Sequence, residues 1–146
     1  MKLWLLVIVV LAGTGGYMLM NSRSADYLEL TAPEAQGLVV AGEVTLIDIR
    51  TPEEWRQTGV AHGAKLVNMV HPGGADGFVS DILKQVNGDA DAPIALICRT
   101  GNRTTQVQRL LVARGFSRVY NVIEGMVGST AGPGWLKRGL PVDPYQ

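Results

Sequence analysis

The chain has little of the residues on which several kinds of protein depend. Its 146 residues include one cysteine, two histidines and two phenylalanines. A lone cysteine, Cys98, excludes an intramolecular disulfide and a zinc site built from cysteines. The fold must therefore be stabilised by an ordinary hydrophobic core, for which a domain of this length is large enough.

Strong charge of either sign is also lacking. The 13 Lys and Arg balance the 13 Asp and Glu, and charged residues make up 18% of the chain. Lys2 and Arg23 are two of the 13 basic residues, so residues 25–146 keep 11 against 13 acidic ones. There is no basic stripe and no run of like charges, which argues against nucleic acid as a partner.

One long apolar segment stands at the N-terminus. Residues 3–20 are 18 residues without a charge, preceded by Lys2 and followed by Asn21-Ser22-Arg23-Ser24. As a helix rising ~1.5 Å per residue, this segment would be about 27 Å long, close to the ~30 Å hydrocarbon core of a membrane. We expect residues 1–24 to form a hydrophobic helix that anchors the chain in a membrane. A signal peptide cleaved after Ser24, which would release a secreted form, is the alternative.

The charges around this segment predict its orientation. Lys2 and the terminal amine lie before it, whereas Arg23 and Asp26 follow it and cancel each other. Positive charge is enriched on the cytoplasmic side of membrane segments. Residues 25–146 are therefore expected outside the cytoplasm, which in a bacterium is the periplasm.

Residues 25–146 alternate short apolar runs with stretches of helical spacing. Thr51 and Glu54 form a capping box, with Pro52 at the first helical position. Near-continuous apolar strands between helices indicate an α/β fold with a parallel sheet covered on both faces. Strands are predicted at 44–49, 65–69, 93–98 and 119–122, helices at 52–56, 78–86 and 104–114, and a Gly-rich loop at 125–134.

Cys98 ends the strongest predicted strand, and the strongest helix begins within six residues. Ligands of parallel sheets bind at the carboxyl ends of the strands, where N–H groups of a tight loop and a helix N-terminus converge on an anion. A cysteine thiolate in that position is stabilised and becomes a nucleophile. Arg99 and Arg103 add positive charge, and Gly101 permits the turn. Cys98 is therefore predicted to react rather than only to fill the core.

Several motifs around Cys98, taken together, resemble the rhodanese family. Cys98-Arg99-Thr100-Gly101-Asn102-Arg103 resembles the family's active-site loop, with a glycine at the fourth position. Asp48-Ile49-Arg50, with Glu53, Trp55 and Gly59, resembles its aspartate–arginine motif. The likeness spans about residues 27–142, and the other motifs are Gly63-Ala64 with Asn68, Val119–Gly125, Gly134-Trp135 and Gly139–Val142.

The resemblance implies a central parallel five-stranded sheet flanked by helices on both faces, within one domain over residues 25–146. It also implies a sulfurtransferase: Cys98 accepts a sulfane sulfur from a small anionic donor such as thiosulfate and becomes a persulfide. Cyanide, a thiol or a redox protein then takes the sulfur. No metal or organic cofactor is needed. The substrate would be bound by Arg99, Thr100, Gly101, Asn102 and Arg103, and the loop would be supported by a polar network of Asp48, Arg50 and Glu53.

The chain departs from the family pattern at three places. Gly59-Val60-Ala61 stands where the family often reads Gly-His-Ile, so His62 and His71 are interpreted as surface or loop residues. Glu124-Gly125 replaces two glycines, and residues 126–134 form a longer loop than usual before Trp135. That loop is expected to influence access of the donor.

Two other functions stay open from the sequence. Cysteine phosphatases and arsenate reductases share a related loop with an arginine six residues after the cysteine, whereas here Arg103 lies at five and Thr104 at six. The tighter loop suits one sulfur atom better than a tetrahedral phosphate. The other function is that of a non-catalytic binding module on the rhodanese fold. Such domains can lose the cysteine, which this chain keeps as Cys98.

Overall fold

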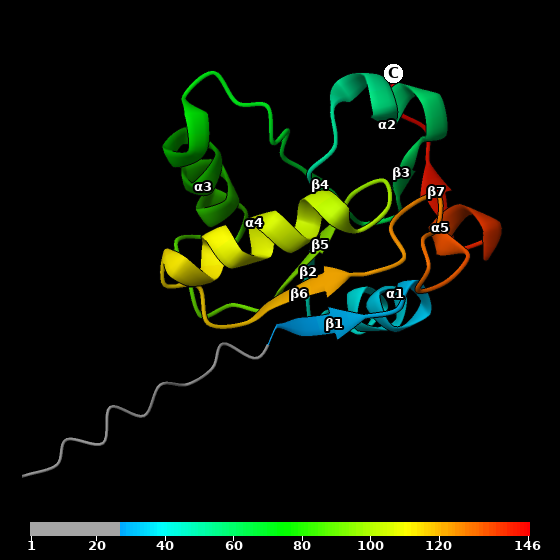
Figure 1. Ribbon diagram of the computed structural model, residues 1–146, viewed down its shortest axis with the longest axis horizontal. Coiled ribbons are helices and arrows are strands. Elements are labelled where there is room, and N and C mark those ends of the chain that lie inside the picture. Colours follow the sequence, from blue (N-terminus) through cyan, green and yellow to red (C-terminus); the bar gives the residue numbers. More distant parts are fainter. Residues whose placement is uncertain (1–26) are drawn as a thin grey trace, which may run out of the picture.

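A computed structural model describes residues 27–146 of the chain (Figure 1). The predicted N-terminal helix, at residues 1–24, lies outside the described residues. Within residues 27–146, no helix has both the length and the apolar character needed to cross a membrane.

Five parallel strands form the central sheet, in the order β1-β6-β5-β2-β4. Their bounds are β1 Leu28–Leu30, β2 Thr45–Asp48, β4 Lys65–Leu66, β5 Ile94–Ile97 and β6 Val119–Val122. Strand β5 is central and pairs with β2 and β6. Two further short strands, β3 (Val60–Ala61) and β7 (Val142–Asp143), form a separate antiparallel ribbon. The five-stranded parallel sheet confirms the predicted fold class.

Helices cover both faces of the sheet (Figure 1). Helices α3 (Gly74–Gln85) and α4 (Asn102–Ala113) contribute to one buried apolar cluster, together with alternate residues of β5 such as Ile94 and Leu96. Helices α1 (Ala32–Val40) and α5 (Gly134–Lys137) contribute to the other cluster, together with Ala95 and Ile97. Side chains of a strand alternate between its faces, so Cys98 falls on the same side as Ile94 and Leu96.

Local signals in the sequence fix the start of two helices. Helix α2 (Pro52–Thr58) begins with the predicted capping box, in which the Thr51 side chain accepts from the Glu54 N–H and the Glu54 carboxylate accepts from the Thr51 N–H. Helix α1 begins with a second capping box, between Thr31 and Glu34. Each box satisfies N–H groups that the first helical turn leaves without a partner.

The structure differs from the predicted elements in extent. Strand β4 ends at Leu66 rather than at residue 69. The chain still follows β2 for three more residues, because the Val67 and Met69 N–H groups donate to the carbonyls of Asp48 and Ile49 at 3.1 Å. Helix α4 begins two residues earlier than predicted. The short elements β1, β3, α5 and β7 and the nine-residue helix α1 were not predicted.

Candidate active site

Cys98 follows β5 directly, at the carboxyl end of the central strand, and its side chain is fully buried. Gly101 adopts a positive φ of 87°, which turns its N–H back so that it donates to the Cys98 Sγ at 3.2 Å. A Cβ at position 101 would lie 2.5 Å from the carbonyl oxygen of Ile123. Only glycine therefore fits this turn, and the turn aims an N–H at the sulfur.

The segment that follows β6 fixes the backbone of the active-site loop through hydrogen bonds. The Met126 N–H donates to the carbonyl of Cys98 at 2.9 Å, and the Val127 N–H donates to the carbonyl of Arg99 at 3.0 Å. Gly125 makes this approach possible, because a Cβ there would collide with the backbone of Arg99. The backbone on either side of the sulfur is thus fixed by the same stretch of chain.

Glu124 stands where the family often has glycine, and its side chain is fully buried. Its carboxylate accepts from Arg138 Nε at 2.7 Å and from the Gly134 N–H at 2.9 Å. A third donor is the Ala32 N–H at 3.4 Å. Glu124 therefore ties the two ends of the loop at 126–134 to each other and to the start of α1.

Arg103 forms an ion pair with Glu54 of α2. Its Nη1 lies 2.8 Å from Oε2, and its Nη2 lies 2.5 Å from Oε1, so the contact is bidentate. The hydrogen bonds from Arg103 lower the pKa of Glu54 to about 2 against its burial, and Glu54 in turn raises the pKa of Arg103. Glu54 also caps α2 through Thr51, so one carboxylate joins α2 to the first turn of α4.

One residue predicted to support the loop differs from the residue that does so in the structure, by a single position. Glu53 is exposed on α2, and the adjacent Glu54 is the residue that contacts the loop. The predicted support by Asp48 and Arg50 corresponds to an ion pair in which both side chains are buried, at 2.8 Å between Arg50 Nη2 and Asp48 Oδ2. Arg50 also donates to the Thr58 hydroxyl at 2.8 Å and therefore joins β2 to the last turn of α2.

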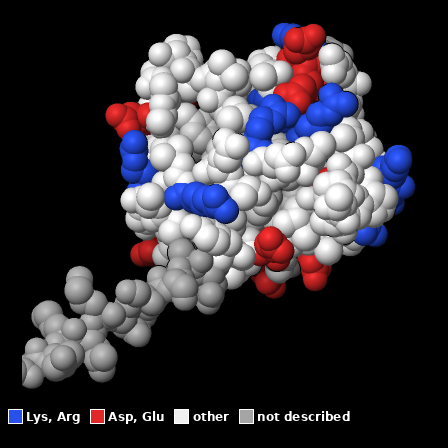
Figure 2. All heavy atoms as spheres, in the orientation of Figure 1, with Lys and Arg blue, Asp and Glu red and all other residues white. Residues whose placement is uncertain are grey.

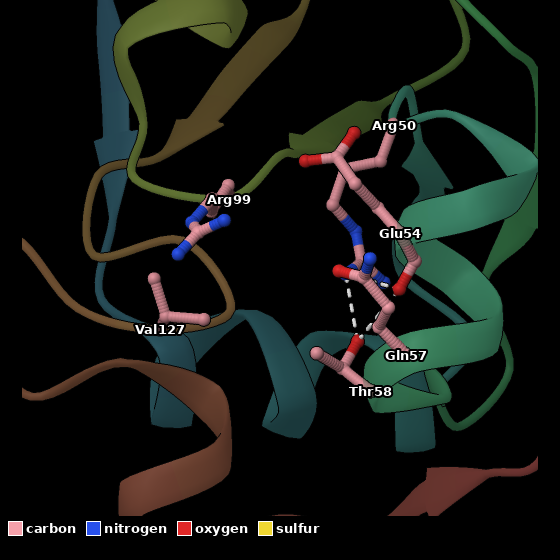
Figure 3. A pocket seen from close by; sticks show the side chains of 6 residues that line it. All are labelled: Arg50, Glu54, Gln57, Thr58, Arg99 and Val127. Carbon is pink, nitrogen blue, oxygen red and sulfur yellow. Dashed lines mark hydrogen bonds between the residues drawn. The ribbon is translucent and has the colours of Figure 1, made fainter.

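The predicted substrate-binding residues do not all face the same space. Arg99 is exposed and lines a small open pocket opposite α2, which Figure 3 shows from close by. None of the ion pairs within residues 27–146 includes Arg99. Thr100, Gly101 and Asn102 line a separate polar pocket beside the Ser129–Ala131 turn. The first pocket is lined by Arg50, Glu54, Gln57, Thr58, Arg99 and Val127.

Charged side chains of both signs lie beside one another over α2 and the loop before α4 (Figure 2). Arg103 is neutralised there by Glu54, and Arg50 by Asp48. Of the two arginines in the loop after Cys98, Arg99 is the one without an ion-pair partner among residues 27–146, so its charge is available to attract an anion.

Two buried polar residues beside Cys98 were not identified from the sequence. Thr104 is fully buried, and its Oγ1 lies 3.5 Å from the Cys98 Sγ. Asn121 is 3% exposed, and its Oδ1 lies 2.6 Å from the Thr104 Oγ1. The only sequence signal for Asn121 is an amide within the otherwise apolar run of β6. The two histidines lie in loops, as predicted: His62 is exposed, and His71 is partly buried and hydrogen-bonded to Asp81.

This fold and this loop define a rhodanese-like domain. The family model described as the rhodanese-like domain matches residues 31–131, and the chain belongs to that family. The chain is 30% identical to a sulfurtransferase of Allochromatium vinosum over 108 residues, which are 74% of this chain and 86% of that protein. It is 28% identical to the thiosulfate sulfurtransferase GlpE of Pseudomonas syringae over 100 residues, 68% of this chain and 84% of that protein.

A solved structure gives the same result. The polysulfide-sulfur transferase homodimer of Wolinella succinogenes superposes with a TM-score of 0.63 at 26% identity, covering 82% of this chain and 80% of that one. The predicted family and the predicted fold are confirmed. The chain is thus related to rhodanese-type sulfurtransferases.

Proposed function

We propose that this protein carries a sulfane sulfur on Cys98, taking it from a small anionic donor such as thiosulfate and passing it to a thiol, cyanide or a redox protein. The observation that carries the proposal is the position of Cys98. Its sulfur lies at the carboxyl end of the central strand and receives the Gly101 N–H, and the loop that follows it carries Arg99 and Arg103. The sulfurtransferase names of the related proteins support the same chemistry.

In the first half-reaction the Cys98 thiolate attacks the outer sulfur of thiosulfate. A bond forms between the Cys98 Sγ and that sulfur, and the sulfur–sulfur bond of thiosulfate breaks, so that its electron pair leaves with sulfite. The new terminal sulfur is an anion. The Gly101 N–H, which already donates to the Cys98 Sγ, would stabilise it together with the other N–H groups of the loop, as an oxyanion hole stabilises an oxygen.

In the second half-reaction a nucleophilic acceptor attacks the terminal sulfur. The bond between the two sulfur atoms breaks, and its electron pair returns to Cys98 as a thiolate. The cycle is therefore redox-balanced and needs no metal and no organic cofactor. Arg99 acts before the chemistry, by attracting a doubly charged donor into the pocket opposite α2.

The Glu54–Arg103 ion pair supports sulfur transfer over phosphatase or arsenate reductase chemistry. A phosphatase loop needs its arginine to hold the oxygens of the transferred group. Here both terminal nitrogens of Arg103 are directed to the Glu54 carboxylate instead. The binding-module alternative leaves Cys98, which this chain keeps, without a function.

Steady-state kinetics test the proposed function. Rates with thiosulfate and cyanide, measured over both concentrations, should show the parallel double-reciprocal lines of a ping-pong mechanism. The variant Cys98→Ser should be inactive. A higher rate on a phosphate ester than on thiosulfate would contradict the proposal, as would sulfur transfer by the Cys98→Ser variant.

Membrane anchoring by residues 1–24, with the domain outside the cytoplasm, is a second part of the proposal. It is supported by the uncharged run at residues 3–20. Strand β1 begins at Leu28, at the amino end of the parallel sheet, and Cys98 lies at the carboxyl end. An anchor would thus attach at the edge of the sheet opposite the reactive sulfur. Labelling of Cys98 by a maleimide that does not cross membranes, compared between intact and lysed cells, tests the orientation. Labelling that occurs only after lysis would contradict it.

A further inference from the structure

A chain of buried polar groups connects Cys98 to β6. The Thr104 Oγ1, in the first turn of α4, lies 3.5 Å from the Cys98 Sγ and 2.6 Å from the Asn121 Oδ1. The Asn121 Nδ2 lies 2.9 Å from the Thr105 Oγ1, and the Thr105 Oγ1 lies 2.9 Å from the carbonyl oxygen of Gly101. This series of hydrogen bonds, which we call the hydrogen-bond chain, leads from the reactive sulfur through the Thr104 and Asn121 side chains to Thr105 and back to the active-site loop.

The position of Asn121 in an apolar strand needs a reason. Asn121 pairs with Leu96 across β5 and β6, and its side chain is 3% exposed. A buried amide costs free energy unless its donors and acceptor find partners. The partners of Asn121 are Thr104, Thr105 and the Gly101 carbonyl, all of which belong to the active-site loop or to the first turn of α4. The amide is therefore directed at the site rather than at the core.

The observed orientation of the amide suits a protonated thiol. Each threonine hydroxyl has one hydrogen to donate. The Thr104 hydroxyl faces two oxygen acceptors, the Asn121 Oδ1 at 2.6 Å and the Gly101 carbonyl at 2.8 Å. With its hydrogen given to either of them, the Thr104 oxygen accepts from the Cys98 thiol. Every hydrogen bond of the series is then donated in the same direction, from the sulfur towards the Gly101 carbonyl.

Rotation of the amide by a half-turn reverses the chain. The half-turn exchanges the Asn121 Oδ1 and Nδ2 and leaves the other atoms in place. Thr105 then donates to Asn121, Asn121 donates to Thr104, and the Thr104 hydrogen is directed at the Cys98 Sγ. The Gly101 carbonyl loses the Asn121 Nδ2, which lies 3.4 Å away, and keeps the Thr105 backbone N–H, at 3.1 Å. In this direction the chain suits a thiolate or a persulfide.

We propose that Asn121 is a positioning residue whose amide orientation sets the direction of this chain, and that the reversed orientation makes Thr104 donate to the Cys98 sulfur. Asn121 thereby stabilises the nucleophile without touching substrate. The persulfide part of this proposal rests on the proposed function, whereas the thiolate part concerns Cys98 alone. The charged groups on the elements packed around the sulfur are Arg99 in the loop, Arg103 on α4 with its partner Glu54 on α2, and the Asp48–Arg50 pair at the end of β2.

The test measures the alkylation rate of the full chain by iodoacetamide as a function of pH. Cys98 is the single cysteine, so the signal reports on it alone. Thr104→Val keeps the shape and removes the donor, so the rate at pH 7 should fall about tenfold and its midpoint should move to higher pH. Thr104→Ser restores a hydroxyl and should stay within about twofold of the wild type. The expected order separates hydrogen bonding from a change in packing.

Asn121→Asp tests whether Asn121 acts through Thr104. Both carboxylate oxygens accept only, so the Thr104 hydrogen is drawn from the sulfur, and the rate at pH 7 should fall about tenfold or more. In the Thr104→Val background the same substitution should cost less than about threefold, through the added charge alone. Equal effects in the two backgrounds would overturn the proposal, because they would show that Asn121 does not act through Thr104.

A second variant covers the case in which Asn121→Asp does not fold. Thr105→Val removes the hydroxyl that supports the reversed amide, and it should slow alkylation at pH 7 about threefold. A wild-type rate in Thr105→Val or in Thr104→Val would overturn the proposal. Alkylation needs no sulfur transfer, so rapid alkylation of a wild-type chain that gains no sulfur from thiosulfate contradicts the proposed function and leaves the role of Asn121 intact.

Discussion

The active-site loop is held on two sides by polar contacts of different kinds. On the α2 side the Glu54–Arg103 ion pair contacts the loop directly, and the buried Asp48–Arg50 pair holds the end of α2 through Thr58 and the Gly59 carbonyl. On the β6 side the contacts are made by neutral hydroxyl and amide groups, of which Thr104 lies against the Cys98 sulfur. Ion pairs fix the position of backbone and helix, whereas neutral groups can reverse a hydrogen bond at little cost. The comparison separates residues that fix the position of the loop from residues that change the reactivity of the Cys98 sulfur.

The largest effect is expected from breaking the buried ion pair on the α2 side. Asp48→Ala leaves the Arg50 guanidinium buried without its carboxylate, and such a loss destabilises a protein by about 3–5 kcal/mol. Urea unfolding monitored by circular dichroism measures the change. Replacing both partners, as in Asp48→Leu with Arg50→Leu, should cost less than Asp48→Ala alone. A destabilisation below about 1 kcal/mol in Asp48→Ala would show that this side does not shape the loop.

The second ion pair should make stability depend on acidic pH. The pKa of Glu54 is lowered from 4.5 to about 2, so its contribution is present above pH 4.5 and is lost as the pH falls towards 2. Because Arg103 is partly exposed, we expect about 1–2 kcal/mol rather than the full value of the shift. Unfolding at pH 5.5 and at pH 2.5 should therefore show a larger loss in the wild type than in Glu54→Gln.

Glu53 provides the matched control for this prediction. It precedes Glu54 on the same helical turn but is exposed. Glu53→Gln should change stability by less than about 0.5 kcal/mol and keep the acid dependence of the wild type. If Glu53→Gln removed that dependence and Glu54→Gln did not, the support would belong to the residue first predicted from the sequence.

A smaller effect, on substrate affinity, is expected from replacing Arg99, the exposed cation that lines the pocket opposite α2. Arg99→Ala should raise the KM for thiosulfate about tenfold, because the variant loses the unpaired charge that attracts the donor. The exposed charge is screened by salt, so the difference from the wild type should shrink as ionic strength rises. Arg99→Lys should retain most of the affinity. A KM independent of both residue 99 and salt would place the donor elsewhere.

The predictable parts of the site are those determined by residues that are close together in the sequence. The apolar run before Cys98, the glycine at 101 and the helical spacing after it lie within one stretch and define strand, turn and helix together. The capping box of Thr51 and Glu54 is equally local. Strands of two or three residues, such as β1, β3 and β7, are too short to show a periodicity, and they were missed for that reason.

The contacts between distant segments were not predictable in the same way. Glu54 and Arg103 are 49 positions apart, and both Glu53 and Glu54 stand in the first turn of the same helix. Which of them faces the loop depends on how α2 packs on the sheet. Thr104 and Asn121, 17 positions apart, meet only because β6 lies beside β5. Sequence periodicity gives the face of an element, whereas such pairs depend on the packing between elements.

The mass of the intact chain after treatment with thiosulfate tests the central proposal most directly. The account predicts a gain of one sulfur atom, about 32 Da, that is reversed by cyanide and absent in Cys98→Ser. A folded chain that gains no sulfur from any donor, or one that gains it equally in Cys98→Ser, would contradict the assignment of Cys98 as the sulfur carrier.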